Sequence, residues 1–334
     1  MRVGVVGAGS WGTAVAAMSA ATAETRLWSR RADLADAINA TGINDPYLPG
    51  IPLPPGLRST SDVAEAVDGA DVVIMAVPSH GFRTVIETIR PSIPVDIPIV
   101  SLTKGIETGT LLRMTQIVVE VLQADPDRVG VLTGPNLARE IALGQPAAAV
   151  IAMRDTDTAA VLQHLLMSPT FRVYTNPDVA GCESAGALKN VMAIAAGMAH
   201  GLGYGDNSKA ALVTRALAEL TRLGIALGGK PLTFAGLAGM GDLIATCFSE
   251  QSRNRQVGVE LGRGKSIDQI VADMHMVAEG VKTTEAVLAL AKRHGVDMPI
   301  AASVGAVLYD GGKPADMVKH LMTREAKAEL HGID

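Results

Sequence analysis

Short apolar runs alternate with helix-like segments through the first half of the chain. Residues 2–6 and 25–29 form short runs typical of β-strands, and residues 71–77 are almost continuously apolar. Similar runs occur at residues 97–102, 128–132 and 147–153. Runs without polar alternation are expected of strands covered on both faces. Because helical segments separate them, the pattern predicts a mostly parallel, doubly wound sheet.

The pattern changes after residues 171–174. From Asp178 onward the chain is rich in Ala, Leu, Gly and Met, and it has helix-length segments, the longest at 179–200 and 208–227, without a convincing strand. A chain of 334 residues is long enough for two domains of about 150 residues each. We therefore predict an α/β domain over residues 1–176 and an all-α domain over residues 177–334.

Composition and charge exclude several classes of protein. A net charge of −5 and 3% aromatic residues argue against nucleic-acid binding. The two cysteines, Cys182 and Cys247, predict neither a disulfide framework nor a metal site, and they favour a reducing cytoplasm. Gly7, Gly9 and Gly12 interrupt a stretch that otherwise imitates a signal peptide. No segment predicts a membrane span.

A glycine-rich turn follows the first predicted strand. Gly7-x-Gly9-x-x-Gly12 lies between that strand and an Ala-rich helical segment. In this context Gly7 permits a tight turn, Gly9 lets a pyrophosphate approach the backbone, and Gly12 lets the helix pack closely on the strand. The free N–H groups of the helix would face the phosphates. The motif predicts a Rossmann-like dinucleotide-binding domain.

The end of the second predicted strand bears on the choice of cofactor. A carboxylate there would bind the 2′-hydroxyl of NAD, whereas arginine accommodates the 2′-phosphate of NADP. This chain has Trp28-Ser29-Arg30-Arg31, with no carboxylate at the tip of the strand. Two cations favour NADPH, and use of NADH also stays open.

Candidate catalytic and substrate-binding residues follow later strands or lie in the helical half. Lys104 and the segment Gly134-Pro135-Asn136 each follow an apolar strand, where ligands bind in open α/β sheets. Lys189 lies in a long apolar helix, where a lowered pKa would suit proton transfer. Asp242 is predicted to lie in an apolar, Gly-rich loop over residues 239–243. Ser252-Arg253-Asn254 opens a helix that Ser252 can cap, an arrangement suited to binding phosphate.

These segments together resemble the bacterial-type NAD(P)-dependent glycerol-3-phosphate dehydrogenase family. The matching pieces run in family order through nearly the whole chain: Gly7-Ala-Gly-Ser-Trp-Gly12-Thr13, Thr103-Lys104-Gly105, Gly134-Pro135-Asn136-x-Ala138-x-Glu140, Glu183-x-x-Gly186-Ala187-Leu188-Lys189-Asn190, Gly239-x-Gly241-Asp242-Leu243-x-x-Thr246-Cys247, Ser252-Arg253-Asn254 and Val277-x-Glu279-Gly280. The resemblance implies reversible reduction of dihydroxyacetone phosphate to sn-glycerol 3-phosphate. It also implies a helical second domain similar to the C-terminal domain of 6-phosphogluconate dehydrogenase.

The resemblance implies roles for individual residues. Lys189 is the expected proton donor and acceptor at the C2 oxygen, and Asp242 holds Lys189 and the substrate hydroxyl. Lys104 would touch substrate and cofactor. The substrate would also meet Gly134, Asn136, Ser252, Arg253 and Asn254. The cofactor would also meet Gly7, Gly9, Ser10, Trp11, Gly12, Arg30, Arg31, Ala138, Arg253, Val277 and Glu279.

Two alternatives remain at this point. A β-hydroxyacid or ketopantoate-type reductase also combines a nucleotide fold, a helical domain and a catalytic lysine, but it lacks the Ser-Arg-Asn phosphate site after a Gly-Asp-Leu segment. A catalytically silent dinucleotide-binding regulator would not need Lys104, Lys189 and Asp242.

The resemblance further implies a homodimer that supplies the backbone of glycerophospholipids.

Overall fold

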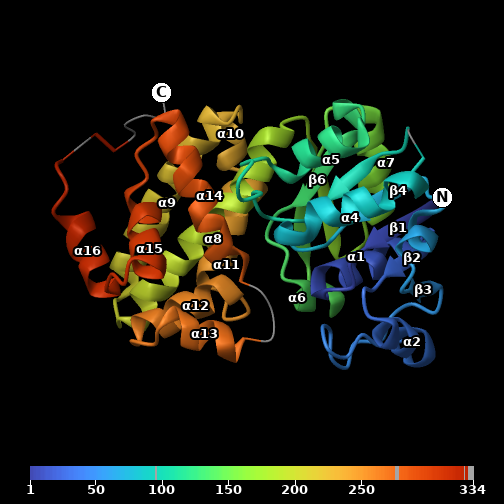
Figure 1. Ribbon diagram of the computed structural model, residues 1–334, viewed down its shortest axis with the longest axis horizontal. Coiled ribbons are helices and arrows are strands. Elements are labelled where there is room, and N and C mark those ends of the chain that lie inside the picture. The colour runs from blue at the N-terminus through green and yellow to red at the C-terminus, as the bar shows by residue number, and fades with distance from the viewer. Residues whose placement is uncertain (95, 275–277, 327, 330–334) are drawn as a thin grey trace. The chain divides into compact units, whose positions relative to one another are not determined.

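The computed structural model describes residues 1–94, 96–274, 278–326 and 328–329 (Figure 1). The chain divides into two compact units, the first formed by residues 1–103 and 114–179. The second contains residues 104–113 and the described residues from 180 onward. Residues 104–113, which the sequence-based division placed in the first domain, thus pack with the second unit.

The first unit contains an eight-stranded sheet in the order β3-β2-β1-β4-β5-β6-β7-β8. All neighbouring strands are parallel except β6 and β7, which are antiparallel. The strands are β1 (Arg2–Val6), β2 (Glu24–Trp28), β3 (Leu57–Thr60), β4 (Val72–Met75), β5 (Ile99–Ser101), β6 (Val129–Thr133), β7 (Ala147–Ala152) and β8 (Phe171–Asn176). The predicted doubly wound, mostly parallel sheet is confirmed.

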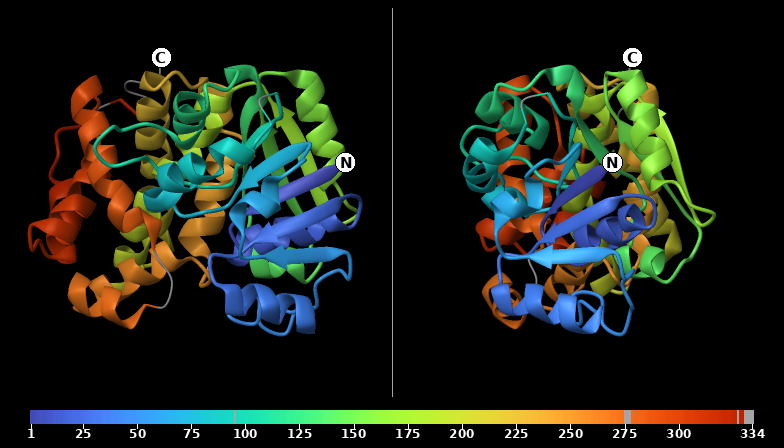
Figure 2. Two further views of the ribbon diagram at one scale, coloured as in Figure 1. Left: turned by 45° about the vertical axis from the view of Figure 1, so that its right-hand side comes forward. Right: turned by 90° about the vertical axis from the view of Figure 1, so that its right-hand side faces the viewer.

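Helices cover both faces of this sheet. Figure 2 shows α4 and α5 on one face and α1 and α7 on the other, in agreement with the helix pairs that pack together. The α-helices of the unit are α1 (Ser10–Ala20), α2 (Ala32–Thr41), α3 (Val63–Val67), α4 (Phe82–Ile89), α5 (Met114–Leu122), α6 (Ala138–Ala142) and α7 (Thr156–Leu166). Three 3-10 turns occur at Ser79–Gly81, Arg90–Ser92 and Pro126–Arg128.

The carboxyl ends of the parallel strands carry the predicted cofactor segments. Because β1 lies between β2 and β4, the strand order reverses at the β1–β4 pair, and ligands bind outside such a switch point. The Gly7 turn follows β1 at this edge. Next to it, the Thr103 hydroxyl donates to the carbonyl oxygen of Val77 at 2.6 Å, which ties the segment after β5 to the segment after β4.

The second unit is helical. Its helices are α8 (Val179–Gly201), α9 (Asp206–Ala226), α10 (Pro231–Phe234), α11 (Asp242–Phe248), α12 (Arg253–Gly262), α13 (Ile267–Asp273), α14 (Glu279–His294), α15 (Pro299–Tyr309) and α16 (Pro314–Met322). A π-helical turn, η4 (Leu237–Gly241), precedes α11. The described residues from 180 onward include no strand, so the predicted all-α character of this half is confirmed.

The central helix α8 is buried over nearly its whole length and packs closely on α12. A Cβ at Gly197 would lie 2.1 Å from the backbone oxygen of Arg255, and one at Gly258 would lie 2.0 Å from that of Ile194. Side chains at either position would therefore force the helix backbones apart. The close crossing fixes the start of α12 beside the middle of α8, which carries Lys189.

One segment is long and apolar enough to be tested as a membrane span. It runs from Pro231 to Phe248, over 18 residues, and 44% of it is buried inside the unit. The segment is divided among α10, η4 and α11, and it carries the buried carboxylate of Asp242. A single apolar segment that carries a buried, ion-paired carboxylate is weak evidence for a span.

Candidate active site

The Gly7–Gly12 turn has the close contacts that its motif predicts. Gly7 adopts φ +125°, and a Cβ there would lie 2.6 Å from the backbone oxygen of Ala76. A Cβ at Gly12 would lie 2.0 Å from the oxygen of Gly7, whereas one at Gly9 would meet nothing within 4 Å. Gly7 and Gly12 are thus required by packing, and Gly9 leaves the backbone open to a ligand.

The start of α1 provides donors that could hold a dinucleotide. Gly9 is its N-cap, and no side chain caps the helix. Ser10 donates its hydroxyl to the oxygen of Tyr47 at 2.9 Å, and Asn44 donates to the oxygen of Ala8 at the same distance. The buried indole N–H of Trp11 has no hydrogen-bond partner among the described residues. An uncapped helix start beside an open glycine fits the pyrophosphate of a dinucleotide.

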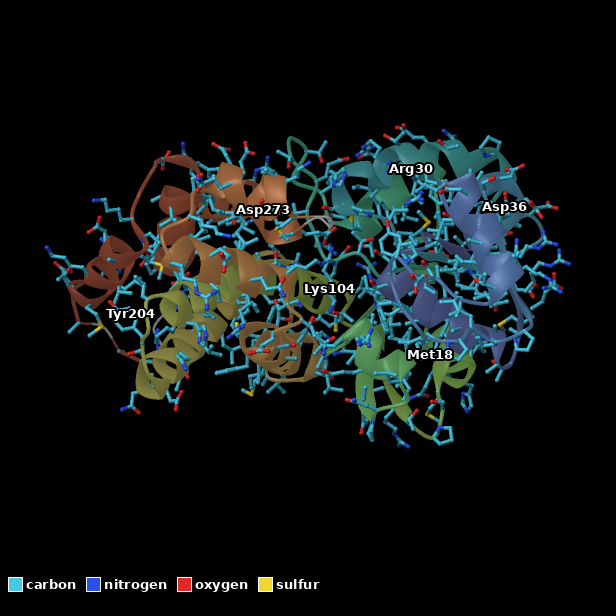
Figure 3. The ribbon with its side chains drawn as sticks, turned by 90° about the horizontal axis from the view of Figure 1, so that it is seen from below. Met18, Arg30, Asp36, Lys104, Tyr204 and Asp273 are labelled. Carbon is cyan, nitrogen blue, oxygen red and sulfur yellow. The ribbon has the colours of Figure 1, made fainter. Side chains whose placement is uncertain are left out.

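The two arginines after β2 differ in their surroundings. Arg31 forms a two-point ion pair with Asp33, in which its Nε lies 3.1 Å from Oδ1. This pairing raises the pKa of Arg31 and lowers the pKa of Asp33. Arg30 is exposed and makes no hydrogen bond or ion pair with any residue that the structure describes (Figure 3). Of the two arginines after β2, Arg30 is therefore the one whose guanidinium group is not engaged by a neighbouring carboxylate.

The segment after β6 supplies buried polar atoms. Gly134 adopts φ +134°, and α6 begins at Ala138. Both polar side-chain atoms of Asn136 are buried without a hydrogen-bond partner in the described part of the chain. Because buried polar groups are normally paired, this amide has hydrogen-bonding capacity left for a ligand or a water molecule.

In the second unit, one carboxylate holds two lysines. Oδ1 of Asp242 lies 2.9 Å from Nζ of Lys189, and Oδ2 lies 2.6 Å from Nζ of Lys104. The side chain of Asp242 is 2% exposed, Lys189 7% and Lys104 16%. The sequence proposed these three residues as the catalytic group, and the fold brings them together. Because the cluster contains two ammonium groups and one carboxylate, its net charge is positive.

Thr246 completes this cluster, and sequence reasoning assigned it no role. Its hydroxyl accepts a hydrogen bond from Nζ of Lys189 and donates to the backbone oxygen of Asp242 at 2.7 Å. The four-residue spacing places Asp242 and Thr246 on one side of α11. Asp242 is itself the first residue of α11, and η4 precedes it. The Gly-rich stretch at 239–241 is thus a π-helical turn and not a loop.

Burial and charge lower the pKa of Lys104 to about 8. Burial of the ammonium group is the main cause, and the neighbouring charge of Lys189 adds to it. The carboxylates of Asp242 and Glu279 act in the opposite direction. Lys104 therefore changes charge close to neutral pH, which ordinary lysines do not do.

The predicted phosphate-binding residues begin α12. Ser252 caps the helix by accepting from the backbone N–H of Arg255 at 3.2 Å, as predicted. Arg253 is exposed. Asn254 is buried and donates to the side-chain oxygen of Asn190 at 2.9 Å, and it accepts from the N–H of Gly280 at 2.9 Å. Glu279 is the first residue of α14.

The other predicted residue in this region, Val277, lies outside the described residues.

Three contacts position Lys104 within the second unit. Asn190, the neighbour of Lys189, donates to the backbone oxygen of Lys104 at 3.0 Å. Ile106 is buried in the helical core. Arg113, at the other end of the segment, pairs with Glu183 at 2.6 Å, and the side chain of Glu183 is 1% exposed. Sequence reasoning missed Arg113, because its partner lies 70 residues away.

Neither cysteine belongs to a group of metal-ligating side chains among the described residues. Within the ranges that the structure describes, no group of three or more His, Cys, Asp or Glu side chains could hold a metal ion. Cys182 and Cys247 are buried free thiols. Burial raises the pKa of Cys247 to about 12, so its thiol stays protonated.

The lowered pKa of Lys104 predicts a pH limit on activity. If the protonated amine stabilises negative charge on a substrate, kcat/KM should fall as the pH rises through about 8, since Lys104 then loses its charge. In Lys104→Arg the guanidinium stays charged, so this alkaline decline should move to higher pH. Initial rates measured from pH 6 to 10 test this. An unchanged alkaline decline in the variant would exclude Lys104 as its cause.

These two constellations define a class of protein. A Rossmann-type glycine turn and a buried lysine–carboxylate centre are the parts of a dinucleotide-dependent oxidoreductase. A model described as NAD-dependent glycerol-3-phosphate dehydrogenase N-terminus matches residues 2–159, and one described as NAD-dependent glycerol-3-phosphate dehydrogenase C-terminus matches residues 178–319. The chain belongs to the NAD-dependent glycerol-3-phosphate dehydrogenase family, as the resemblance implied.

Individual relatives of this family match the chain over nearly its full length. The chain is 55% identical over 331 residues to glycerol-3-phosphate dehydrogenase [NAD(P)+] 2 of Sphingopyxis alaskensis, covering 99% of each chain. It is 52% identical over 334 residues to glycerol-3-phosphate dehydrogenase [NAD(P)+] of Thermobifida fusca, again covering 99% of each. The crystal structure of glycerol-3-phosphate dehydrogenase from Coxiella burnetii superposes with a TM-score of 0.92 at 38% identity, covering 97% of this chain and 99% of that one.

Proposed function

We propose that the protein reversibly reduces dihydroxyacetone phosphate to sn-glycerol 3-phosphate with a reduced nicotinamide cofactor. The observation that carries this proposal is the buried Asp242 carboxylate shared by Lys189 and Lys104. Reduction of a ketone adds a hydride to carbon and a proton to oxygen. The cluster holds a proton donor and a cationic environment for that oxygen. The family and its named relatives support the same reaction.

Lys189 is the proposed proton donor. Its ammonium group is almost completely buried and is held by Asp242 and Thr246, so its direction is fixed. When bound, the reduced nicotinamide would supply the hydride that C2 of the ketone receives. Lys189 gives its proton to the C2 oxygen, and in the reverse direction the neutral amine takes the proton from the hydroxyl. Asp242 holds the amine in both directions.

Lys104 is the proposed electrostatic stabiliser. Negative charge develops on the C2 oxygen as the hydride arrives. A second ammonium group in a buried environment stabilises that charge more strongly than water would. The resemblance also assigns Lys104 to the cofactor, together with Ala138, Arg253 and Glu279, and we retain these assignments as proposals.

The phosphate of the substrate is assigned to the start of α12. Ser252, Arg253 and Asn254 lie where a helix of ten residues offers its first N–H groups, and an arginine can grip two phosphate oxygens. Asn254 is bonded to Asn190, next to Lys189, so the phosphate site is tied directly to the proton donor. Gly134 and Asn136 are the proposed substrate residues of the first unit, where the Asn136 amide is unpaired.

Arg253→Ala tests the phosphate assignment. We expect kcat/KM for dihydroxyacetone phosphate to fall about tenfold or more, because a charge-assisted hydrogen bond is lost. The rate with dihydroxyacetone, which lacks the phosphate, should fall less, and that smaller loss reflects the proposed cofactor contact of Arg253. Arg263→Ala, at the other end of α12, is the matched control and should keep the preference for the phosphorylated ketone. If Arg253→Ala also keeps it, the phosphate binds elsewhere.

We further propose that NADPH is preferred and that NADH is also used. Arg30 is free to bind a 2′-phosphate, and Arg31 can do so if it exchanges its contact with Asp33. Changing both to glutamine should weaken NADPH binding about tenfold or more and leave NADH binding unchanged. Dissociation constants for both cofactors measure this. Equal losses for the two cofactors would contradict the assignment.

The alternative functions have less support. Both family models, and the two relatives at 55% and 52% identity, are glycerol-3-phosphate dehydrogenases. A regulator that only binds a dinucleotide does not require a buried cluster of two lysines and a carboxylate. The homodimer and the supply of the glycerophospholipid backbone stay predictions from the resemblance, and the cytoplasmic location stays a prediction from the two cysteines.

A further inference from the structure

A cavity in the second unit lies among helices α8, α9, α11 and α12. It has a volume of about 110 Å³. Three of its lining residues carry basic side chains, namely His200 from α8, Lys209 from α9 and Arg255 from α12. Cys247 and Phe248 of α11 contribute an apolar wall. None of the catalytic lysines and none of the residues 252–254 lines this cavity.

The cavity has more positive than negative charge. The guanidinium group of Arg255 makes no hydrogen bond or ion pair with any of the residues described. Lys209 pairs at 3.0 Å with Asp206, whose side chain is fully exposed, so that carboxylate remains in solvent. The pKa of His200 is lowered, first by burial and then by Arg255, Lys209 and Arg263, and Glu250 opposes this only partly.

We propose that this cavity binds a phosphate group, either inorganic phosphate or the phosphate of a small phosphomonoester. An unpaired guanidinium group presents a fork of donors that matches two phosphate oxygens. Lys209 and His200 can donate to the others. The volume is far below the roughly 300–1,000 Å³ of pockets for larger ligands, so a single oxyanion group fits and a nucleotide does not.

This site is separate from the proposed substrate phosphate site, although both involve α12. Residues 253 and 255 are two positions apart on a helix, which turns their side chains about 200° from each other. Arg253 is exposed, whereas Arg255 lines the cavity. The inference therefore does not rest on the proposed function, and either assignment can fail without the other.

Calorimetric titration with inorganic phosphate, at constant ionic strength, tests the proposal. The full-length protein should bind two phosphates per chain. Arg255→Gln should lose one of them, with affinity reduced about tenfold or more, and keep the other. Arg253→Gln should lose only the second phosphate. Arg263→Gln, which removes an exposed arginine that is paired with Glu260, is the matched control and should keep both.

Lys209→Gln provides a second variant if Arg255→Gln does not fold, and it should weaken the same phosphate. Unchanged affinity and stoichiometry in either folded variant would overturn the proposal. Titration with acetate distinguishes the class of anion. Equal affinity for acetate would also overturn the assignment, because a phosphate site requires donors to more than two oxygens.

Discussion

Replacing Lys189 by methionine is expected to lower kcat for reduction of dihydroxyacetone phosphate by about 10²–10⁴-fold, the usual effect of removing a general acid. Methionine has a similar length and is apolar, so it suits a side-chain position that is 7% exposed. Asp242 keeps its ion pair with Lys104 in this variant, and the carboxylate is not left unpaired. The loss should therefore be in chemistry, not in folding.

Two measurements separate these effects. The dissociation constant for NADPH and the melting temperature of Lys189→Met should stay near those of the wild type. Lys292→Met, which replaces an exposed lysine on α14, is the matched control and should keep full activity. A near-normal kcat in Lys189→Met would show that Lys189 is a structural residue and that another group donates the proton.

Replacing Asp242 by asparagine should affect both activity and stability. The carboxylate is 2% exposed and is the counter-ion of two buried ammonium groups. Removing one partner of a buried ion pair leaves an uncompensated charge and typically costs about 3–5 kcal/mol. Turnover should also fall, because nothing then fixes the direction of Lys189. Asp273→Asn, whose side chain is 72% exposed, is the matched control and should change little.

The stability loss in Asp242→Asn should depend on pH. Without the carboxylate, the charged form of Lys104 is disfavoured in the folded state, and its neutral form is not. Unfolding by urea should therefore show a deficit that becomes smaller as the pH rises from 7 towards 8, and its charge-dependent part should be largely gone above about pH 8. A deficit that is constant from pH 7 to 10 would show that lost packing, and not the unpaired charges, causes it.

The sequence predicted the elements whose signals are local. Short stretches of sequence were enough to predict the strand β1, the Gly7–Gly12 turn and α1. The cap at Ser252 was predicted from that residue and its neighbours. The strands β3 and β8 were missed for physical reasons. β3 has four residues, only one of them apolar, and β8 alternates buried and exposed positions at the edge of the sheet.

The candidate site was predicted in its residues but not in its contacts. Lys104 follows a sheet strand, so it was assigned to the first domain, yet Asn190 and the core around Ile106 hold it in the second unit. These contacts join residues more than 80 positions apart, and no local pattern encodes them. The role of Thr246 also needed the structure, because a threonine in an apolar helix has no distinctive signal.

The central claim is that this protein transfers a hydride to dihydroxyacetone phosphate. The most direct test is to follow the nicotinamide absorbance when the purified protein is mixed with NADPH and this ketone, and to identify the product. We predict that one NADPH is oxidised for each sn-glycerol 3-phosphate formed, with little oxidation when dihydroxyacetone or ketopantoate replaces the substrate. Failure of the folded protein to oxidise either NADPH or NADH with dihydroxyacetone phosphate would contradict the proposed function.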